Sequence, residues 1–269
     1  MNSTPVDVVV LAGERPGGNA LAQALALPSA LLAKVAGRAV IEWTFAALFA
    51  SNHARLVVVG PAAELVEQHP EFSELAADPR VQWLAPQAGP AASAAHGIES
   101  LSGFPVLLTA ADHALLQGHW IDEFVQQALE KAQASDADIV IGLVPYTVVQ
   151  AQFPESKRTL LKFSDGPFCG SNLFLITGPA GVNGIRYWRN LEQLRKSPWR
   201  MISSIGWRLC VRYLLGRLSS DDAMAALSRA ANCQVRMCQL SEPRLAVDVD
   251  SEADFKLANR LLAEQTTAS

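Results

Sequence analysis

Short runs of apolar residues, many of them β-branched, recur along the first half of the chain and are separated by stretches with helical spacing. The runs predict strands at 6–11, 55–59, 80–84, 105–109 and 138–143. The stretches between them predict helices near 39–51, 61–67, 91–101 and 118–133. This alternation is typical of right-handed βαβ units, which build a mostly parallel sheet with helices on both faces.

The pattern changes in the second half of the chain. Two apolar runs over 158–176 surround Asp165-Gly166-Pro167, a turn sequence that predicts a hairpin. Residues 185–230 have helical character, with a break at Ser197-Pro198. Short strands near 234–239 and 245–249 are predicted next, and then a final helix that begins at Ser251.

These elements predict an α/β fold made of three layers, with a mostly parallel sheet between two layers of helices. We expect one domain over 1–269, in which 1–145 and 146–269 are two halves. The helices of about 185–230 form an insertion in the second half. Sites in such sheets lie beyond the carboxyl ends of the strands.

A glycine-rich turn follows the first predicted strand directly. The segment Ala12-Gly13-Glu14-Arg15-Pro16-Gly17-Gly18 joins that strand to the next element. Such a turn exposes backbone N–H groups that phosphate oxygens can approach. The guanidinium of Arg15 suits a role in clamping a triphosphate, because it can bind two phosphate oxygens at once.

Two acidic residues each end a later apolar run. Asp112 follows Val-Leu-Leu-Thr-Ala-Ala, and Asp250 ends the run before Ser251. Carboxyl ends of parallel strands meet at one edge of a sheet, so these two carboxylates can together hold Mg²⁺ on bound phosphates. Asp248 competes with Asp250 as the second ligand, since alternation along a strand points both side chains to the same face.

Composition and charge narrow the class of protein. Half of the residues are apolar and 18% are charged, which suits a sizeable core and argues against disorder. No apolar run reaches the ~18 residues that span a bilayer, and the first twelve residues do not read as a signal peptide. The four cysteines lack metal-type spacing, so we expect free thiols and a cytoplasmic protein.

Positive charge is concentrated in residues 186–217, which hold eight basic residues and one acid, Glu192, in a chain of net charge −4. Five tryptophans and tyrosines lie among these cations. One interpretation is a helical subdomain with solvated arginines. The other is a surface for an anionic substrate or an anionic membrane. Nucleic acid is not expected as a partner, because the rest of the chain is acidic and shows no nucleic-acid module.

Several short motifs occur in the order found in one family. They are Leu11-Ala12-Gly13-x-Arg15, Pro28-Ser29-x-x-Leu32-x-Lys34-Val35-x-Gly37-Arg38, Gly89-Pro90-x-x-Ser93, Leu107-Leu108-Thr109-Ala110-Ala111-Asp112, Gly170-Ser171-Asn172-Leu173-Phe174 and Val247-Asp248-Val249-Asp250-Ser251-x-x-Asp254. In these motifs the chain resembles the GT-A-type nucleotidyltransferases, close to molybdenum cofactor guanylyltransferase. The resemblance covers nearly the whole chain.

The resemblance implies a GT-A, Rossmann-like fold and transfer of an NMP unit from an NTP to a phosphorylated small molecule or lipid head group, with release of pyrophosphate. It implies Mg²⁺ as cofactor, held by Asp112 and Asp250, with Arg15, Lys34 and Asp112 as catalytic residues. The residues implied to bind the nucleotide are Leu11, Ala12, Gly13, Gly17, Gly18, Gly89 and Ser93. Those expected on the acceptor side are Lys157, Arg158, Lys162, Ser171 and Asn172.

The chain departs from the family at one position. Aligned without gaps on Gly37-Arg38, the phosphate-binding lysine of the family falls on Ala30. If this segment is helical, Lys34 lies one turn away and can reach the same space. The alternative is a catalytically weak or inactive nucleotide-binding protein on the same fold. A GT-A glycosyltransferase is disfavoured, because Ala110-Ala111-Asp112 lacks the usual Asp-x-Asp. The nucleotide base and the oligomeric state stay open.

Overall fold

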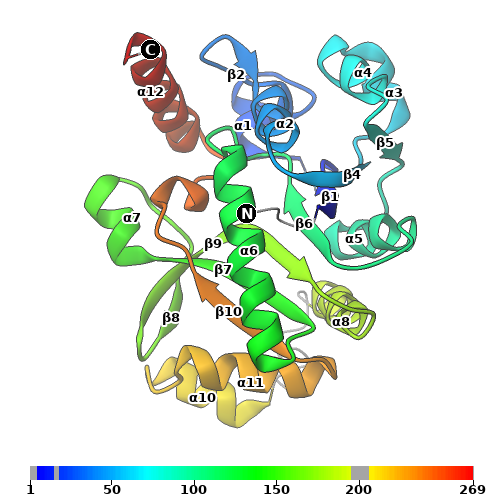
Figure 1. Ribbon diagram of the computed structural model, residues 1–269. Helices are drawn as coiled ribbons and strands as arrows, with labels where there is room; N and C mark the ends of the chain where they lie inside the picture. Colours follow the sequence, from blue (N-terminus) through cyan, green and yellow to red (C-terminus); the bar gives the residue numbers. More distant parts are fainter. Residues whose placement is uncertain (1–4, 15–17, 195–205, 269) are drawn as a thin grey trace.

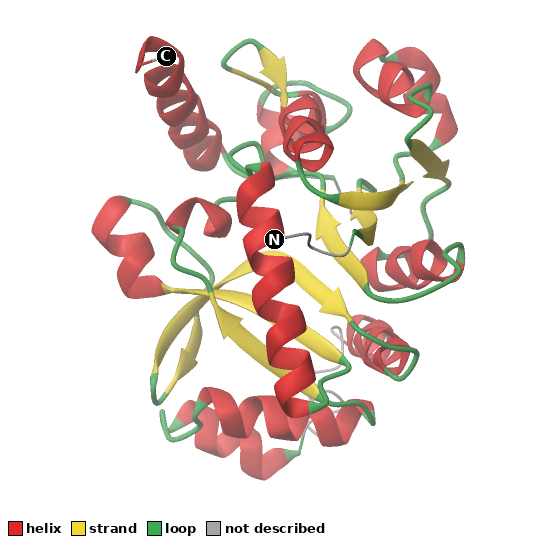
Figure 2. Cartoon of the chain, viewed as in Figure 1, coloured by secondary structure: helices red, strands yellow, loops and turns green. Residues whose placement is uncertain are grey.

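An eight-stranded sheet forms the centre of the protein, and helices cover both of its faces (Figures 1 and 2). The computed structural model describes residues 5–14, 18–194 and 206–268. Seven strands follow the order β10-β7-β9-β6-β1-β4-β5, and β8 pairs with β9. The sheet therefore contains strands from both halves of the chain.

The strands of the first half lie where the apolar runs predicted them. They are β1 (Val6–Leu11), β4 (His53–Val59), β5 (Val81–Leu84), β6 (Val106–Ala110) and β7 (Ile139–Pro145). β1 pairs in parallel with β4 and β6, and β4 with β5; at the other end of the sheet β7 pairs in parallel with β10 (Val235–Gln239). The prediction of a mostly parallel sheet is confirmed.

The long strand β9 (Gly166–Ile176) joins these two parallel groups. It pairs antiparallel with β6 on one side and with β7 on the other. It also forms the predicted hairpin with β8 (Leu161–Phe163), whose turn carries Asp165 and Gly166. The second half of the chain therefore connects the two parallel groups through the antiparallel strand β9.

Both faces of the sheet are buried, which explains why the strands are continuous apolar runs. Val8 and Val10 contact one core and Val9 contacts the other. The first core is covered by α1 (Ala20–Ala24), α2 (Val40–Ala50), α4 (Pro70–Ala76), α6 (Gly118–Ser135), α7 (Tyr146–Gln152) and α12 (Glu252–Ala268). The second is covered by α5 (Pro90–Glu99), α8 (Gly181–Leu194) and α11 (Ser220–Ala231). This is the expected three-layer arrangement.

Serine side chains cap the starts of two helices, and the second of these starts was predicted from the sequence. The Ser219 hydroxyl accepts a hydrogen bond from the Asp222 N–H at 3.2 Å and begins α11. The Ser251 hydroxyl accepts one from the Asp254 N–H at 3.3 Å and begins α12. Both bonds satisfy amide groups that the first helical turn leaves unpaired.

Two expected elements differ from the structure. The segment 245–249 is not a strand: a 3₁₀ turn, η2 (Pro243–Ala246), comes first, and the Val249 N–H then bonds the Asp112 carbonyl at 2.9 Å. Its apolar residues are buried in the first core, where η2 packs on β7, β9 and α7, without a strand ladder. The predicted break at Ser197-Pro198 lies outside the described residues.

The segment that opens at Pro28 is not a continuous helix. Ser29 caps a single 3₁₀ turn, η1 (Ala30–Leu32), and a small hairpin of β2 (Lys34–Val35) and β3 (Arg38–Ala39) follows. The tight turn of this hairpin places Gly37 at φ 83°, a backbone conformation that glycine adopts without strain. Two further helices in the described part of the chain are α3 (Ala63–Gln68) and α10 (Trp207–Leu214). No helix in the described part of the chain is both long and apolar enough to cross a membrane.

Candidate active site

A pocket lies beyond the carboxyl ends of β1 and β6, at the edge where sites in such sheets are expected. The turn after β1 supplies the backbone of residues 11–14, and η1 supplies Ala30 and Leu31. Asn19, which caps α1 through its side chain, also lines the pocket. Asp112 and Asp250 complete the lining. The fold therefore brings together the glycine turn and the two acids that the sequence singled out.

Backbone contacts hold the two acids beside each other. The Thr44 hydroxyl, buried in α2, donates to the Ala111 carbonyl at 2.9 Å and anchors the turn just before Asp112. The Asp112 carbonyl in turn accepts the Val249 N–H at 2.9 Å. Asp250 follows directly, so its carboxylate enters the same pocket from a segment more than one hundred residues away.

The electrostatics of this pair suit a cation. Burial and the neighbouring carboxylates of Asp248, Asp254 and Asp112 raise the pKa of Asp250 to about 6. A bound divalent ion would offset this repulsion. Mg²⁺ is commonly held by one or two carboxylates together with substrate phosphates, and Asp112 and Asp250 fit that donor set. Among the residues that the structure describes, no three His, Cys, Asp or Glu side chains form a complete metal site by themselves.

Asp248 is engaged elsewhere. The Arg158 guanidinium, which is only 6% exposed, lies 3.2 Å from the Asp248 carboxylate and also pairs with Asp254. This buried network ties the loop after α7 to the segment that precedes α12. Asp248 is thereby paired inside the chain, whereas Asp250 lines the pocket. The Arg158 side chain is paired with internal acids in this structure, and its predicted contact with the acceptor stays a prediction.

No sequence motif singled out His113, yet this residue is part of the site. Its imidazole is 3% exposed, and Nε2 lies 3.6 Å from the Asp112 carboxylate. The Asn172 side-chain amide lies 2.8 Å from the same Nε2. Asn172 has a φ of 53°, a left-handed backbone conformation, at the point where the pairing of β9 with β7 is irregular. Only the pairing of β6 with β9 reveals this contact, and no signal in the local sequence predicts it.

Ala30 lines the pocket, but Lys34 does not reach it. The Lys34 ammonium lies 2.5 Å from the Glu71 carboxylate and 3.8 Å from that of Glu42. The expectation that Lys34 reaches the space beside Ala30 assumed one helix, and the chain instead turns into β2 after η1. No lysine or arginine appears among the described residues that line the pocket.

The turn at Gly89, which was predicted to contact the nucleotide, is bound by a carboxylate from another helix. The Glu192 carboxylate of α8 accepts the Ala91 N–H at 3.2 Å at the start of α5, next to Gly89. The Ser93 hydroxyl accepts the Gln87 N–H at 3.0 Å and shapes the turn before this helix. Gly89 and Ser93 therefore do not line the pocket of Asp112, and a carboxylate lies where the sequence predicted nucleotide contacts.

The remaining predicted residues fall into three groups. Arg15 and Gly17 lie outside the described residues, and Gly18 is exposed beside them. Lys157 and Lys162 are exposed on the loop and strand before the β8–β9 turn. Ser171 is buried, and its hydroxyl donates to the Gly142 carbonyl at 2.7 Å. Its part in the structure is therefore to join β9 to β7.

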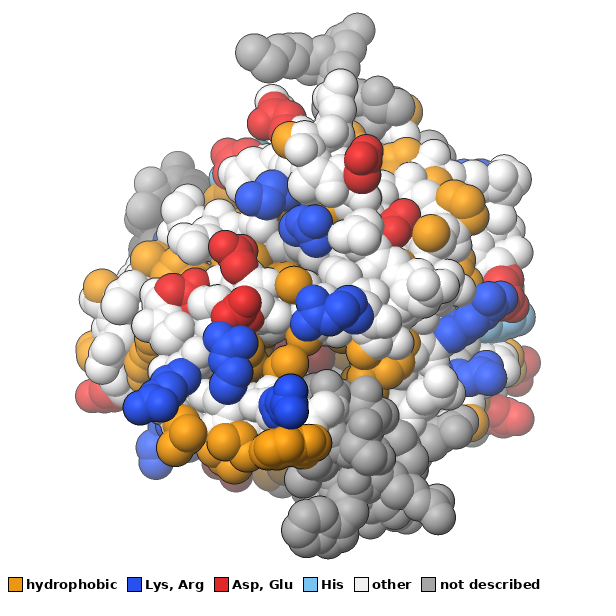
Figure 3. All heavy atoms as spheres, turned by 90° about the horizontal axis from the view of Figure 1, so that it is seen from below, with side chains coloured by type: hydrophobic (Ala, Val, Ile, Leu, Met, Phe, Trp, Pro, Cys, Tyr) orange, Lys and Arg blue, Asp and Glu red, His pale blue; other side chains and the backbone are white. Residues whose placement is uncertain are grey.

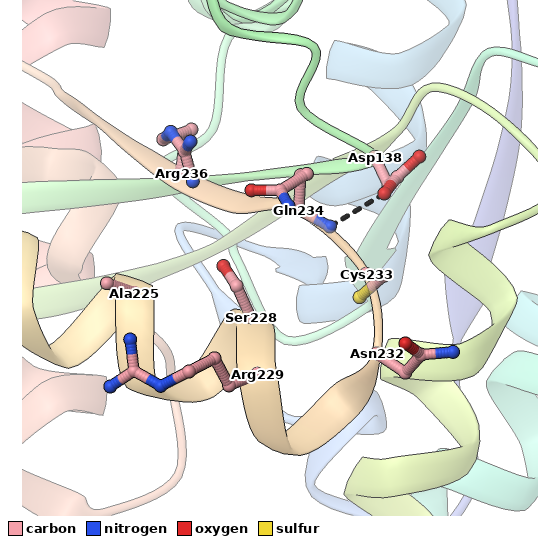
Figure 4. Close-up of a pocket in the computed structure, with 8 residues that line it drawn as sticks. All are labelled: Asp138, Ala225, Ser228, Arg229, Asn232, Cys233, Gln234 and Arg236. Carbon is pink, nitrogen blue, oxygen red and sulfur yellow. Dashed lines mark hydrogen bonds between the residues drawn. The ribbon is translucent and has the colours of Figure 1, made fainter.

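A larger cavity of about 600 Å³ lies away from these residues, between α11 and the start of β10 (Figure 4). Arg229 and Arg236 line it together with the amide of Gln234. The Gln234 N–H donates to the Asp138 carboxylate at 2.6 Å, which fixes the turn into β10. None of the residues expected to bind nucleotide, metal or acceptor lies in this cavity.

Comparison with known proteins identifies the family of the chain. The model of the MobA-like NTP transferase domain matches residues 8–151, more than half of the chain. The chain belongs to this family. A GT-A-type nucleotidyltransferase was expected from the motifs, and the match confirms it: the protein is a nucleotidyltransferase enzyme. No curated protein sequence matches the chain.

Solved structures share the fold over nearly the whole chain. A hypothetical transferase from Thermus thermophilus is 27% identical with a TM-score of 0.75, and the alignment covers 94% of this chain and 100% of that one. The 2-C-methyl-D-erythritol 4-phosphate cytidylyltransferase from Thermus thermophilus is 18% identical with a TM-score of 0.55, over 97% and 100% of the two chains. At that identity the second likeness shows the fold alone.

Proposed function

We propose that this nucleotidyltransferase uses Mg²⁺ to transfer an NMP unit from an NTP to a phosphorylated small molecule or lipid head group. The observation that supports the proposal is the convergence of Asp112 and Asp250 beside the glycine turn after β1. The free thiols of Cys169, Cys210, Cys233 and Cys238 suit a reducing compartment, so we place the enzyme in the cytoplasm.

The chemistry is a phosphoryl-type displacement. A phosphate oxygen of the acceptor forms a bond to the α-phosphorus of the NTP, and the bond from that phosphorus to the bridging oxygen breaks, releasing pyrophosphate. The acceptor needs little activation, because a phosphate monoester is largely dianionic near neutral pH. The Mg²⁺ held by Asp112 and Asp250 would neutralise charge on the triphosphate.

The residues of the chain then act mainly by position. The turn after β1 lines the pocket, so its backbone N–H groups are candidates to bind phosphate oxygens without carrying charge, apart from that of Ala12, which donates to the Val59 carbonyl. His113 contacts the Asp112 carboxylate, and Asn172 contacts His113, so the imidazole is held against that carboxylate and restricts its orientation. Rigid placement of this kind contributes to rate by holding the reacting groups in line.

One observation favours a second candidate, a protein that binds NTP with slow or no turnover. The pocket contains Ala30 where the family lysine is expected, and Lys34 is paired with Glu71 instead. Loss of a cation aimed at developing charge can cost about 10²-fold or more in rate. We therefore treat turnover as the quantity that separates the two candidates.

The test is thermal unfolding with ATP, CTP, GTP and UTP, each with and without Mg²⁺, together with a pyrophosphate-release assay on a panel of phosphorylated acceptors. A ligand that binds only the folded state raises the midpoint by mass action. A Mg²⁺-dependent shift with pyrophosphate release is expected. A shift without release from any acceptor would favour the second candidate, and no shift with any nucleotide would contradict both.

A further inference from the structure

The helix α10 (Trp207–Leu214) has no buried residue and exposes an apolar stripe to solvent. Within the described part of the chain, six large apolar side chains are exposed, and four of them are on this helix or at its end: Trp207 at 63%, Val211 at 43%, Leu214 at 82% and Leu215 at 62%. The spacing of these four positions places them on one side of a helix. Stable monomers seldom leave such a stripe uncovered.

A neighbouring strand extends this surface. The Tyr213 hydroxyl accepts the Lys162 N–H at 3.2 Å, so β8 lies against α10. Leu161, which is 38% exposed, precedes Lys162 on that strand. Figure 3, which looks at the molecule from below, shows apolar side chains gathered next to several Lys and Arg side chains on this face. The docking face is defined here as Leu161, Lys162 and residues 207–217.

The charge of the docking face is one-sided. Residues 206–218 contain Arg208, Arg212 and Arg217 and no acid. Arg212 pairs with Asp222 of α11, while the described ion pairs do not include Arg208 or Arg217. The Arg208 guanidinium lies 5.5 Å from the centre of the Trp207 ring, which places a cation at the border of the apolar stripe. Such a border of cations around apolar side chains is typical of helices that lie in a membrane interface.

We propose that the docking face binds the surface of an anionic membrane, with α10 lying in the plane of the head groups. Trp207, Leu214 and Leu215 would enter the boundary of the acyl chains, and Lys162, Arg208 and Arg217 would contact lipid phosphates. A second copy of the chain is a poorer partner, because pairing two such faces brings like charges together. The rest of the chain carries a net negative charge, so an anionic surface also repels other faces and orients the molecule.

The position of the docking face agrees with this role. In Figure 1, α10 lies at the end of the molecule opposite α1, whose cap Asn19 lines the pocket of Asp112. A membrane at α10 thus leaves that pocket open. The inference does not depend on the proposed chemistry, because it concerns a separate surface.

The test is co-sedimentation with phosphatidylcholine vesicles that contain or lack phosphatidylglycerol. We expect binding to the anionic vesicles at low salt, release as salt screens the contact, and little binding to the neutral vesicles. Arg208→Glu with Arg217→Glu should weaken partitioning about thirtyfold or more, since each cation near such a surface contributes roughly a factor of five. Leu214→Gln with Leu215→Gln should weaken it about tenfold or more, through lost apolar burial.

Matched controls separate the docking face from general charge and hydropathy. Lys256→Glu with Arg260→Glu makes the same change in net charge on α12, and Leu25→Gln removes another exposed leucine. Both controls should bind as the native protein does. Circular dichroism and the unfolding midpoint confirm that each variant folds. Three results would overturn the inference: no binding to anionic vesicles, equal binding to neutral ones, or equal loss in the α12 variant.

Discussion

At the scale of single residues, the site depends on a carboxylate placed where its charge is unfavourable. Asp250 shares its surroundings with Asp248, Asp254 and Asp112, and its pKa is raised to about 6. Arg158 compensates Asp248 and Asp254 but does not contact Asp250. A residue retained at such a cost to the free protein is typical of a functional site, and here the opposing benefit is cation binding.

Asp250→Asn should therefore stabilise the protein when no metal is present. In the native protein the folded state holds more protons than the unfolded state between pH 3.8 and about 6, so its stability falls as pH rises through that window. The variant lacks this loss. We expect a gain of about 1 kcal/mol above pH 6, after allowing for solvent screening of this partly buried group, and no gain near pH 4. Thermal unfolding in chelator across this range measures it.

The same variant should lose the stabilisation that Mg²⁺ with NTP confers on the native protein. The two effects have opposite signs, which separates a ligand role from a purely structural one. Asp122→Asn, on the exposed surface of α6, serves as a control of equal charge change. If Asp250→Asn lowers stability in chelator, or keeps the full response to Mg²⁺ and NTP, the metal assignment to Asp250 is wrong.

Substitutions at Ala30 and Lys34 should have different effects on nucleotide binding. Ala30→Lys returns a cation to the pocket beside Asp112 and should lower the KM for NTP about tenfold, the value of one charge-assisted hydrogen bond. Lys34→Ala removes an exposed ion pair with Glu71 and should cost less than ~1 kcal/mol in stability without changing KM. Steady-state kinetics on both variants tests the assignment. Abolished activity in Lys34→Ala would show that the loop rearranges when nucleotide binds.

At the scale of elements, the contact between α5 and α8 links the two halves of the chain. Glu192 on α8 caps the start of α5 in place of a side chain from the cap residue, which is Gly89. A carboxylate at a helix N-terminus is stabilising, because it meets unpaired amides and the positive end of the helix dipole. The same carboxylate repels a polyanionic ligand that approaches this turn.

Glu192→Gln should accordingly lower the KM for NTP while lowering stability by about 0.5–1 kcal/mol. The amide oxygen of glutamine can still accept the Ala91 N–H, so the helix start is kept and only the charge is lost. Glu130→Gln on α6 makes the same change of charge at a position that is far from this turn in the sequence, and it serves as the control. An unchanged KM together with the lower stability would show that the nucleotide does not approach α5.

Close packing of α5 on the sheet gives a further prediction. A methyl group added at Gly97 would lie 2.5 Å from the Val9 Cγ1 of β1 and 3.0 Å from the Val59 Cγ2 of β4. Gly97→Ala should destabilise the protein by about 1–3 kcal/mol, as overpacking does in well-filled cores. Gly103→Ala is the matched control, since no atom lies within 4 Å of its added carbon. Equal unfolding midpoints for the two variants would contradict this packing.

At the scale of the whole molecule, the described parts of the basic segment 186–217 lie on two different helices. Its first part is α8, which packs on α5 and α11, and its last part is α10, which lies at the far end of the molecule (Figure 1). Basic residues that are close together in the sequence therefore lie in two places. Some are on α8, which contacts α5 of the first half of the chain, and the others are on the docking face. An acceptor bound at the pocket of Asp112 is therefore expected to be insensitive to changes on α10.

The sequence by itself determined the layers of this protein and the edge at which its site lies. Apolar runs of strand length, separated by helical periods, predict buried parallel strands because both faces of such strands must be covered. Asp112 follows from the same pattern, because it comes after β6 at the edge where the parallel strands end, whereas Asp250 reaches that edge from a segment that is not a strand. These features depend on the local periodicity of apolar residues, which can be read directly from the sequence.

Only the tertiary structure decided which charged groups are available to a ligand. Arg158 and Lys34 are cations in suitable positions along the sequence, yet folding pairs them with Asp248, Asp254 and Glu71. His113 becomes part of the site only because β9 brings Asn172 against it. Such pairings join residues far apart in the chain, and they depend on which surfaces the fold brings within a few ångströms. No local sequence pattern encodes which distant residues come into contact.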